Sequence, residues 1–133
     1  MAIVVPESLI RVAVPANPDV LHLLRSVTAS VGARMSMSLD DVEELRIAVD
    51  EAAALLLDRV DDPGGRTLEL ALTCTDRSLT ANVSLDGAGA SDDDARASWP
   101  WRVITAVTDD ASIQRTAGRL TITFTKSAPG SDR

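Results

Sequence analysis

Two adjacent carboxylates, Asp50 and Glu51, lie inside an apolar run of residues 41–58, and they are the side chains best suited to chemistry. A carboxylate there could act as a general base if a substrate hydroxyl came within hydrogen-bonding reach. Leu55 follows Glu51 by one helical turn, so the two side chains would stack on the same helix edge. Spacing alone fits a solvated edge of an ordinary core helix better than a catalytic edge.

A second candidate site lies where a predicted strand meets a glycine-containing turn, at Leu85, Asp86, Gly87, Ala88 and Gly89. Glycine lets another molecule's backbone or ring approach closely. The Asp86 carboxylate could accept a hydrogen bond from an exocyclic amine. A plain strand-to-loop turn explains the same residues, because Asp-Gly forms such turns often.

The aromatic side chains are few, and two of them, Trp99 and Trp101, flank Pro100. Exposed tryptophans are favoured anchors for protein partners, so both are candidate partner-binding residues. A tryptophan near a helix start is more often half-buried, with its indole N–H satisfied. The three carboxylates at 92–94 could hold a hard cation, but three adjacent carboxylates favour a solvated loop, and no metal site is predicted.

A helix beginning at Ser38 is expected to position Glu51. Carboxylates fill its first turns, where they favour the positive end of the helix dipole. Apolar residues then follow the 3-4-3-4 spacing of a buried stripe: Val42, Leu45, Val49, Ala52 and Leu56. Glu51 would lie to one side of this stripe, together with Glu44, Leu55 and Asp58.

The residues before this helix predict a strand and a first helix. Residues 8–15 alternate in polarity, as a strand does. The apolar residues of that strand are Leu9, Val12 and Val14. Asn17 can cap a helix and Pro18 suits its first position, while Gly32 is a suitable C-terminal stop.

The residues after the second helix predict two hairpins separated by a third helix. The strands are expected at 67–75, 78–85, 112–116 and 119–126, the third helix at 101–108, and a frayed tail at 127–133. The order β-α-α-β-β-α-β-β predicts a two-layer α+β sandwich. Its mixed or antiparallel sheet would have about five strands, with three helices on one face. The length of 133 residues predicts one domain over 1–133.

The charge balance limits the kinds of partner. The formal net charge is −7, and Lys126 is the only lysine. An acidic chain without a basic patch is a poor nucleic-acid binder and is unsuited to an anionic membrane. Cys74 and His22 are each alone, which excludes a disulfide framework and a His-rich metal site. The N-terminal residues lack the pattern of a secretory signal, so a cytoplasmic location is expected.

Three segments together resemble the anti-sigma-factor branch of the GHKL, or Bergerat-fold, ATPases, especially the actinobacterial stress-sigma regulators. The resemblance covers residues 9–126. ELRIAVDEAAALLL looks like the N-box helix of that family, and VSLDGAG looks like its strand and D-x-G-x-G box. SWPWRVITAVTDDASIQ and the following RLTITFTK look like its last helix and closing hairpin.

The resemblance implies a role for each matching position. In the family, the N-box Glu is the base toward a serine of an antagonist protein, and an Asn four residues later holds Mg²⁺. Glu51 takes the Glu position, but the Asn position is Leu55, which cannot ligate a metal. Magnesium requires oxygen ligands in octahedral geometry, so the resemblance predicts that Mg²⁺ binding is lost.

The nucleotide-binding positions are also altered. When Gly87 and Gly89 are aligned with the glycines of the box, Leu85 falls on the Asp that hydrogen-bonds adenine. A shift of one residue puts Asp86 at that position, but alanines then replace the glycines. The second glycine box, which closes over the phosphates, is not recognisable. ATP binding is therefore expected to be weak or absent.

The resemblance implies a regulator that sequesters a sigma factor and is released by an antagonist of the anti-anti-sigma type, often as a homodimer. The alternative is a live serine protein kinase that uses Mg²⁺-ATP, with Glu51 as base and Asp86 at adenine. A third possibility is an interaction domain unrelated to sigma control.

Overall fold

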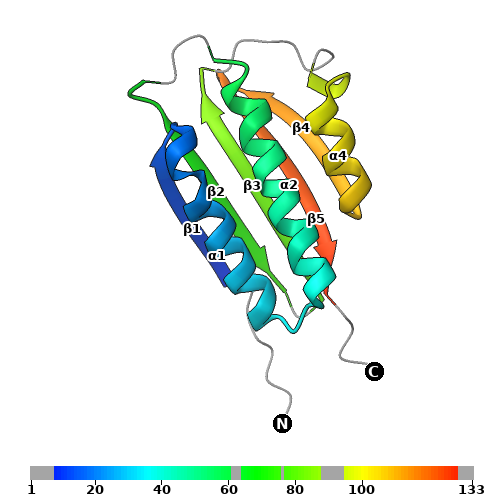
Figure 1. Cartoon of the computed structure of the whole chain (residues 1–133). Helices are drawn as coiled ribbons and strands as arrows, with labels where there is room; N and C mark the ends of the chain where they lie inside the picture. Colours follow the sequence, from blue (N-terminus) through cyan, green and yellow to red (C-terminus); the bar gives the residue numbers. More distant parts are fainter. Residues whose placement is uncertain (1–7, 61–63, 76, 88–94, 129–133) are drawn as a thin grey trace.

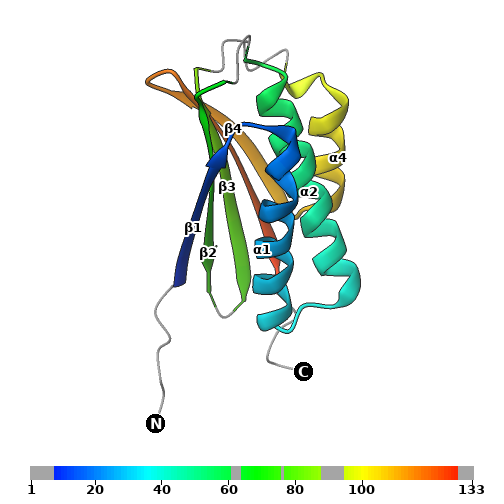
Figure 2. The same ribbon diagram turned by 60° about the vertical axis from the view of Figure 1, so that its left-hand side comes forward.

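The computed structural model describes residues 8–60, 64–75, 77–87 and 95–128. It consists of an antiparallel sheet with helices packed on one of its faces (Figures 1 and 2). The elements are β1 (Ser8–Pro15), η1 (Pro18–Val20), α1 (Leu21–Arg34), α2 (Leu39–Leu57), β2 (Thr67–Cys74), β3 (Ser78–Asp86), α4 (Trp99–Val107), β4 (Asp110–Thr116) and β5 (Arg119–Ser127). The strand order is β1-β2-β3-β5-β4, and each neighbouring pair is antiparallel. The predicted two-layer α+β sandwich is confirmed.

Alternation along the strands builds the core between the two layers. Every second residue of the central strands faces the helices and is buried: Leu68, Leu70, Leu72, Leu79, Ala81, Val83, Leu85, Leu120, Ile122 and Phe124. From α2 the predicted stripe meets them, with Leu45, Val49, Ala52 and Leu56 buried and Val42 packed at the margin. The periods of 2 and 3.6 that the sequence displays are thus the periods of burial.

Among the residues that the structure describes, no helix covers the opposite face of the sheet, as Figure 2 shows. Most of its side chains are polar, and several bond across the strands. The Thr80 and Thr125 hydroxyls are 3.1 Å apart, and the Thr123 hydroxyl donates to Asn82 Oδ1 at 2.6 Å. A face of this composition needs no apolar cover.

The predicted helix starts are confirmed. The Ser38 side chain accepts from the backbone N–H of Asp41 at 3.0 Å, and Asn17 accepts from that of Asp19 at 2.9 Å. The third helix begins at Trp99, two residues earlier than predicted, because Ser98 acts as its cap and Pro100 fits the first turn.

The predicted helix stop at Gly32 is wrong, because α1 continues to Arg34. A Cβ at Gly32 would lie 3.3 Å from side-chain atoms of both Leu45 and Val42, so glycine lets α1 and α2 approach each other. The left-handed residue that follows the helix is Ser36, with φ of 61°.

β1 has the predicted bounds, Ser8–Pro15, but its apolar residues do not all share one face. Val12 and Val14 face the helices, whereas Leu9 lies on the open face and is 55% exposed. An odd spacing from Val12 puts Leu9 on the other side of a strand. At the other end of the chain, β5 includes Ser127, and Ala128 is buried, with its N–H donating to Arg77 O at 2.7 Å. The rest of the predicted tail lies outside the described residues.

Within the described ranges, no helix is long and apolar enough to cross a membrane.

Candidate functional site

The two flanks of α2 face different helices, and this decides where Glu51 lies. On one flank Gly32 of α1 packs against Leu45, and Arg25 Nη1 donates to Asp50 Oδ1 at 2.8 Å. On the other flank Glu44 reaches Lys126, whose Nζ also donates to Val107 O of α4 at 3.0 Å. At about 100° per residue, Glu51 falls on the flank of Glu44, which faces α4.

Glu51 is half-buried at this flank. Among the residues that the structure describes, it makes no hydrogen bond or ion pair. Its neighbour Asp50 is instead engaged by Arg25. The carboxylate of Glu51 therefore remains able to accept a proton or a cation from another molecule.

Leu55 is 1% exposed and belongs to the apolar core. The prediction of a solvated edge is wrong at this residue, because α4 packs over that flank of α2 (Figure 1). Leu85, near the end of β3, is fully buried in the same core. Hydrocarbon therefore fills both positions that the family resemblance gives to metal and adenine recognition.

Asp86 lies on the opposite side of the sheet from Leu85, as alternation along β3 requires. Its Oδ1 accepts from Arg119 Nη1 at 2.8 Å, and Arg119 also donates to Ser84 Oγ at 2.7 Å. This carboxylate is occupied within the open face of the sheet. The geometry does not bring it together with Glu51, which lies in the helix layer.

Gly87 has a φ of 80° and donates its N–H to Gly118 O at 2.8 Å. A Cβ at Gly87 would lie 1.8 Å from Arg66 Nη1, which donates to Asp86 O at 3.1 Å. The Arg66 side chain of the same chain thus fills the space that the missing Cβ of Gly87 leaves open. Gly89 lies outside the described residues.

The two tryptophans lie on different sides of α4. Trp99 is 70% exposed, whereas Trp101 is half-buried and packs against the core. Relative to the buried Ile104, helical geometry places Trp101 about 60° to one side and Trp99 about 140° to the other. The interpretation as core residues holds for Trp101 and is wrong for Trp99.

An ion cluster at the N-terminal end of α2 was not predicted. Lys126 faces the helices from β5, with its Nζ 2.5 Å from Glu44 Oε1 and 3.7 Å from Asp41 Oδ1. Burial lowers the pKa of Lys126, but the hydrogen bond to Glu44 and the charges of Glu44, Asp41 and Asp109 outweigh it, so the pKa is raised. The signal in the sequence was a lone lysine at an inward position of an alternating strand.

Asp109 closes the same end of the molecule. Its Oδ2 accepts the backbone N–H of Ser127 at 2.6 Å, and this hydrogen bond holds the pKa of the carboxyl below its ordinary value. Burial raises the pKa of the Cys74 thiol, which gives that residue no reactive character.

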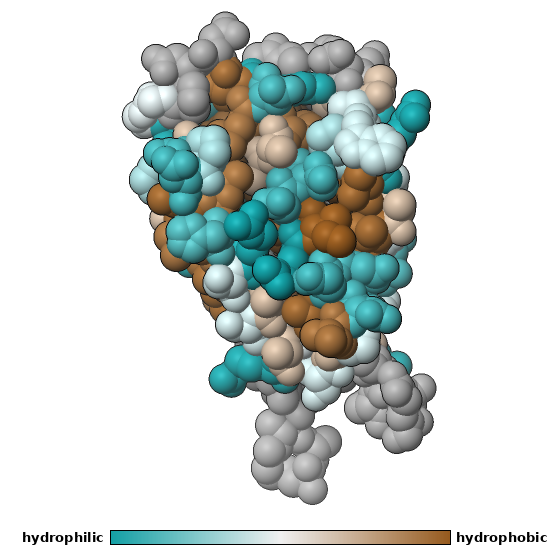
Figure 3. Space-filling model, in the orientation of Figure 1, coloured by the Kyte–Doolittle hydropathy of each residue, from teal (hydrophilic) through white to brown (hydrophobic). Residues whose placement is uncertain are grey.

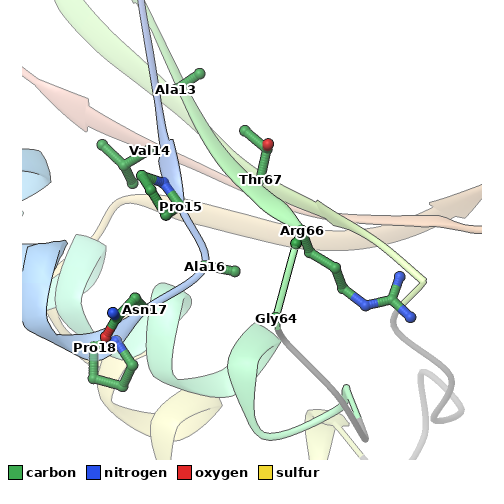
Figure 4. Close-up of a pocket in the computed structure, with 10 residues that line it drawn as sticks. Ala13, Val14, Pro15, Ala16, Asn17, Pro18, Gly64, Arg66 and Thr67 are labelled. Atoms are coloured by element: carbon green, nitrogen blue, oxygen red, sulfur yellow. The ribbon is translucent and has the colours of Figure 1, made fainter.

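A hollow of about 650 Å³ lies at the β1–β2 edge and is lined by residues 13–18 and 64–67 (Figure 4). None of the predicted site residues lines it. Arg66, its one charged side chain, points away from Ala16 and Pro18 in Figure 4. The hollow offers no group of catalytic type, and we place the candidate site on α2.

The described residues contain no group of three His, Cys, Asp or Glu side chains that could hold a metal ion. The carboxylates at 92–94 lie outside the described ranges. Leu55 supplies no ligand oxygen.

The helix layer on one face of this antiparallel sheet, with a glutamate on the α4-facing flank of the central helix, agrees with the GHKL-like fold that the sequence resemblance implies. The chain is 33% identical over 60 residues to serine-protein kinase RsbW of Halalkalibacterium halodurans, a match that covers 45% of this chain and 36% of that protein. No family model matches the sequence.

The fold is similar to that of a Mycobacterium tuberculosis protein solved as its RsbU and RsbW domains, with a TM-score of 0.72 and 18% identity. That match covers 92% of this chain and 34% of the other. The chain thus matches about a third of the length of each of these two proteins. The sequence match confirms the resemblance to the anti-sigma branch of the GHKL proteins, and the structural match confirms the fold.

Proposed function

We propose that this chain is an anti-sigma-like regulator that works by binding rather than by phosphoryl transfer. It would sequester a sigma factor and release it when an antagonist of the anti-anti-sigma type binds. The similarity to RsbW supports the kind of partner. The working unit would be a cytoplasmic homodimer that serves a stress response.

The burial of Leu55 and Leu85 is the observation that carries this proposal. Phosphoryl transfer depends on a positioned metal ion and on contacts to the phosphates. A leucine inside the core cannot provide an oxygen to Mg²⁺, and a second leucine cannot accept a hydrogen bond from adenine. ATP binding would accordingly be weak or lost, and Mg²⁺ would have no dedicated ligand.

The charge supports protein partners over other classes. The net charge of −7 opposes binding to nucleic acid and to anionic membranes. The exposed Trp99 is a suitable anchor for a protein, whereas Trp101 packs against the core on the other side of α4.

Co-purification tests the proposal. The tagged chain is mixed with each sigma factor and each candidate antagonist of its source organism, and captured partners are quantified. We expect one sigma factor to be retained without nucleotide and to be displaced by one antagonist. Failure to retain any sigma factor or antagonist would reject the proposal.

The half-buried Glu51, which has no partner within the described residues, favours a second candidate function. A live serine kinase would use this carboxylate to accept the proton of an antagonist serine. Incubation with γ-labelled ATP, Mg²⁺ and the antagonist decides between the two functions. Label on the antagonist that disappears in Glu51→Gln would establish the kinase; no label favours binding alone.

A further inference from the structure

We propose that the surface formed by Ile47, Val103 and Trp99, here called the α2–α4 ridge, binds a basic amphipathic helix of a partner protein. The inference rests on the proposed binding function and adds to it the surface and the chemistry of the partner. It also separates Trp99, which belongs to the ridge, from Trp101, which does not.

The Lys126 contacts fix how α2 and α4 align. Lys126 joins Glu44 of α2 to the Val107 carbonyl of α4, so these two residues lie at one level. The two helices run side by side in opposite directions (Figure 1). One helical turn from this level, toward the C-terminal end of α2, Ile47 of α2 therefore lies beside Val103 of α4. Two turns from it, Glu51 lies level with Trp99.

The same residues share the outer surface between the two helices. Ile47 is 39% exposed and Trp99 is 70% exposed, while Val103 is half-buried between them. Helical geometry turns Val103 and Trp99 toward α2 and turns Ile47 toward solvent on the side of α4. Figure 3 shows apolar surface over this part of the helix layer, bounded by hydrophilic surface.

The charges around the ridge select the partner. Two acidic residues of the α2 surface are already paired, Glu43 with Arg46 and Asp50 with Arg25. Glu51 has no ion-pair partner among the described residues, and the helix alignment puts it level with Trp99. Arg102 is the basic residue of α4; helical geometry places it one turn from Trp99 on the side facing away from α2, so it borders the ridge opposite Glu51.

A basic helix with one apolar stripe fits this surface. Apolar side chains of the partner helix, spaced one and two turns apart, would contact Val103, Ile47 and Trp99. A Lys or Arg beside this apolar stripe would form an ion pair with Glu51. A second copy of the chain fits less well, because both partners would carry the same net charge of −7. Few side chains carry most of the binding energy at such surfaces, and an exposed Trp is the strongest candidate.

A designed peptide tests the ridge without knowledge of the natural partner. The probe is a helix of about 18 residues, or five turns, with a leucine stripe flanked by Lys and Arg. A control peptide has the same stripe flanked by Glu. Calorimetric titration should give saturable binding of the basic peptide and none of the acidic one.

Variants of the chain then locate the binding surface. We expect Trp99→Ala, Ile47→Asp and Glu51→Lys each to weaken the basic peptide by about tenfold or more. The matched control is Leu23→Asp on α1, where a leucine is 44% exposed on another part of the surface. Its affinity should stay within about twofold of the parent, because surface changes outside a contact are close to neutral. Thermal unfolding of each variant verifies its fold, and Trp99→Ala suffices if Ile47→Asp does not fold.

Two results would overturn the inference: no binding of the basic peptide, or equal loss of affinity in Leu23→Asp and the ridge variants. Capture of a sigma factor that the ridge variants leave unchanged would also reject the ridge while leaving the proposed function intact. If the parent chain itself captured no sigma factor, the proposed function would be rejected instead.

Discussion

The two ends of the contact between α2 and α4 are held in different ways. At the N-terminal end of α2, Lys126 joins Glu44 to the Val107 carbonyl through a cluster of charges. At the C-terminal end, Leu55 is buried in hydrocarbon. At the polar end, Lys126 links the two helices. At the apolar end, Leu55 stands at the position that the family resemblance gives to a metal ligand. Under the proposed binding function, α2 would serve as a scaffold, because its charge cluster lies at the opposite end of the helix from Leu55.

The largest expected effect comes from making the apolar end polar. Leu55→Asn should lower the free energy of unfolding by about 3–5 kcal/mol, because it removes buried methyl groups and buries an amide without a partner. It should not create Mg²⁺-ATP binding. Urea unfolding measures the loss, and nucleotide titration tests for a gain.

Ala54→Asn is the matched control for Leu55→Asn. Ala54 is exposed on the same helix, so this change should cost only the difference in helix propensity, about 0.7 kcal/mol. Similar losses in the two variants would show that Leu55 faces a cavity rather than a packed core. A gain of Mg²⁺-ATP affinity in Leu55→Asn would show that the site is intact apart from its ligand.

The second effect comes from removing the charge at the polar end. Lys126→Met should cost about 1–2 kcal/mol, since it leaves Glu44 without its partner while Glu44 is still partly hydrated. Lys126→Arg should recover part of this loss, and an equal loss in both variants would contradict the role of charge.

The same variant has a defined pH dependence. The raised pKa of Lys126 means that its contribution is present below the ordinary value of 10.5 and is lost as the pH rises through the folded-state pKa. The difference between parent and Lys126→Met should therefore be constant near neutral pH and narrow above about pH 10.5. A difference that stays constant through the alkaline range would mean that Lys126 acts by packing only.

The smallest effect should appear at Asp109. Its pKa is lowered, so its contribution is present above the ordinary value of 3.8 and is lost as the pH falls through the folded-state pKa. The parent and Asp109→Asn should therefore differ in unfolding free energy at pH 7 and converge below about pH 4. Thermal unfolding from pH 7 down to pH 3 measures this convergence. Parallel curves for the two proteins would contradict it.

Much of the fold could be predicted from local patterns. The strands around Leu70, Val83 and Ile122 follow a period of 2, and the α2 stripe follows a period of 3.6. The sequence therefore predicts which faces of these elements are buried. Gly32 is a different case, because glycine ends helices and also permits close helix packing. Only the position of α2 decides which role applies.

The site could be predicted in part. Helical spacing alone places Glu51 and Leu55 on one flank, and the structure confirms the helix that carries them. The burial of Leu55 depends on α4, which comes more than 40 residues later in the chain. The cluster around Lys126 likewise joins residues from α2, α4 and β5, so no local pattern reveals it. The positions of Trp99 and Trp101 depend on where α4 starts, which Ser98 determines.

Calorimetric titration with ATP, with and without Mg²⁺, tests the central claim most directly. The account predicts no saturable binding at millimolar nucleotide, with or without the metal, and no rise in the unfolding temperature, because only a ligand that binds the folded state stabilises it. Saturable binding that is tighter than millimolar and requires Mg²⁺ would contradict the account and establish a working nucleotide site beside Glu51.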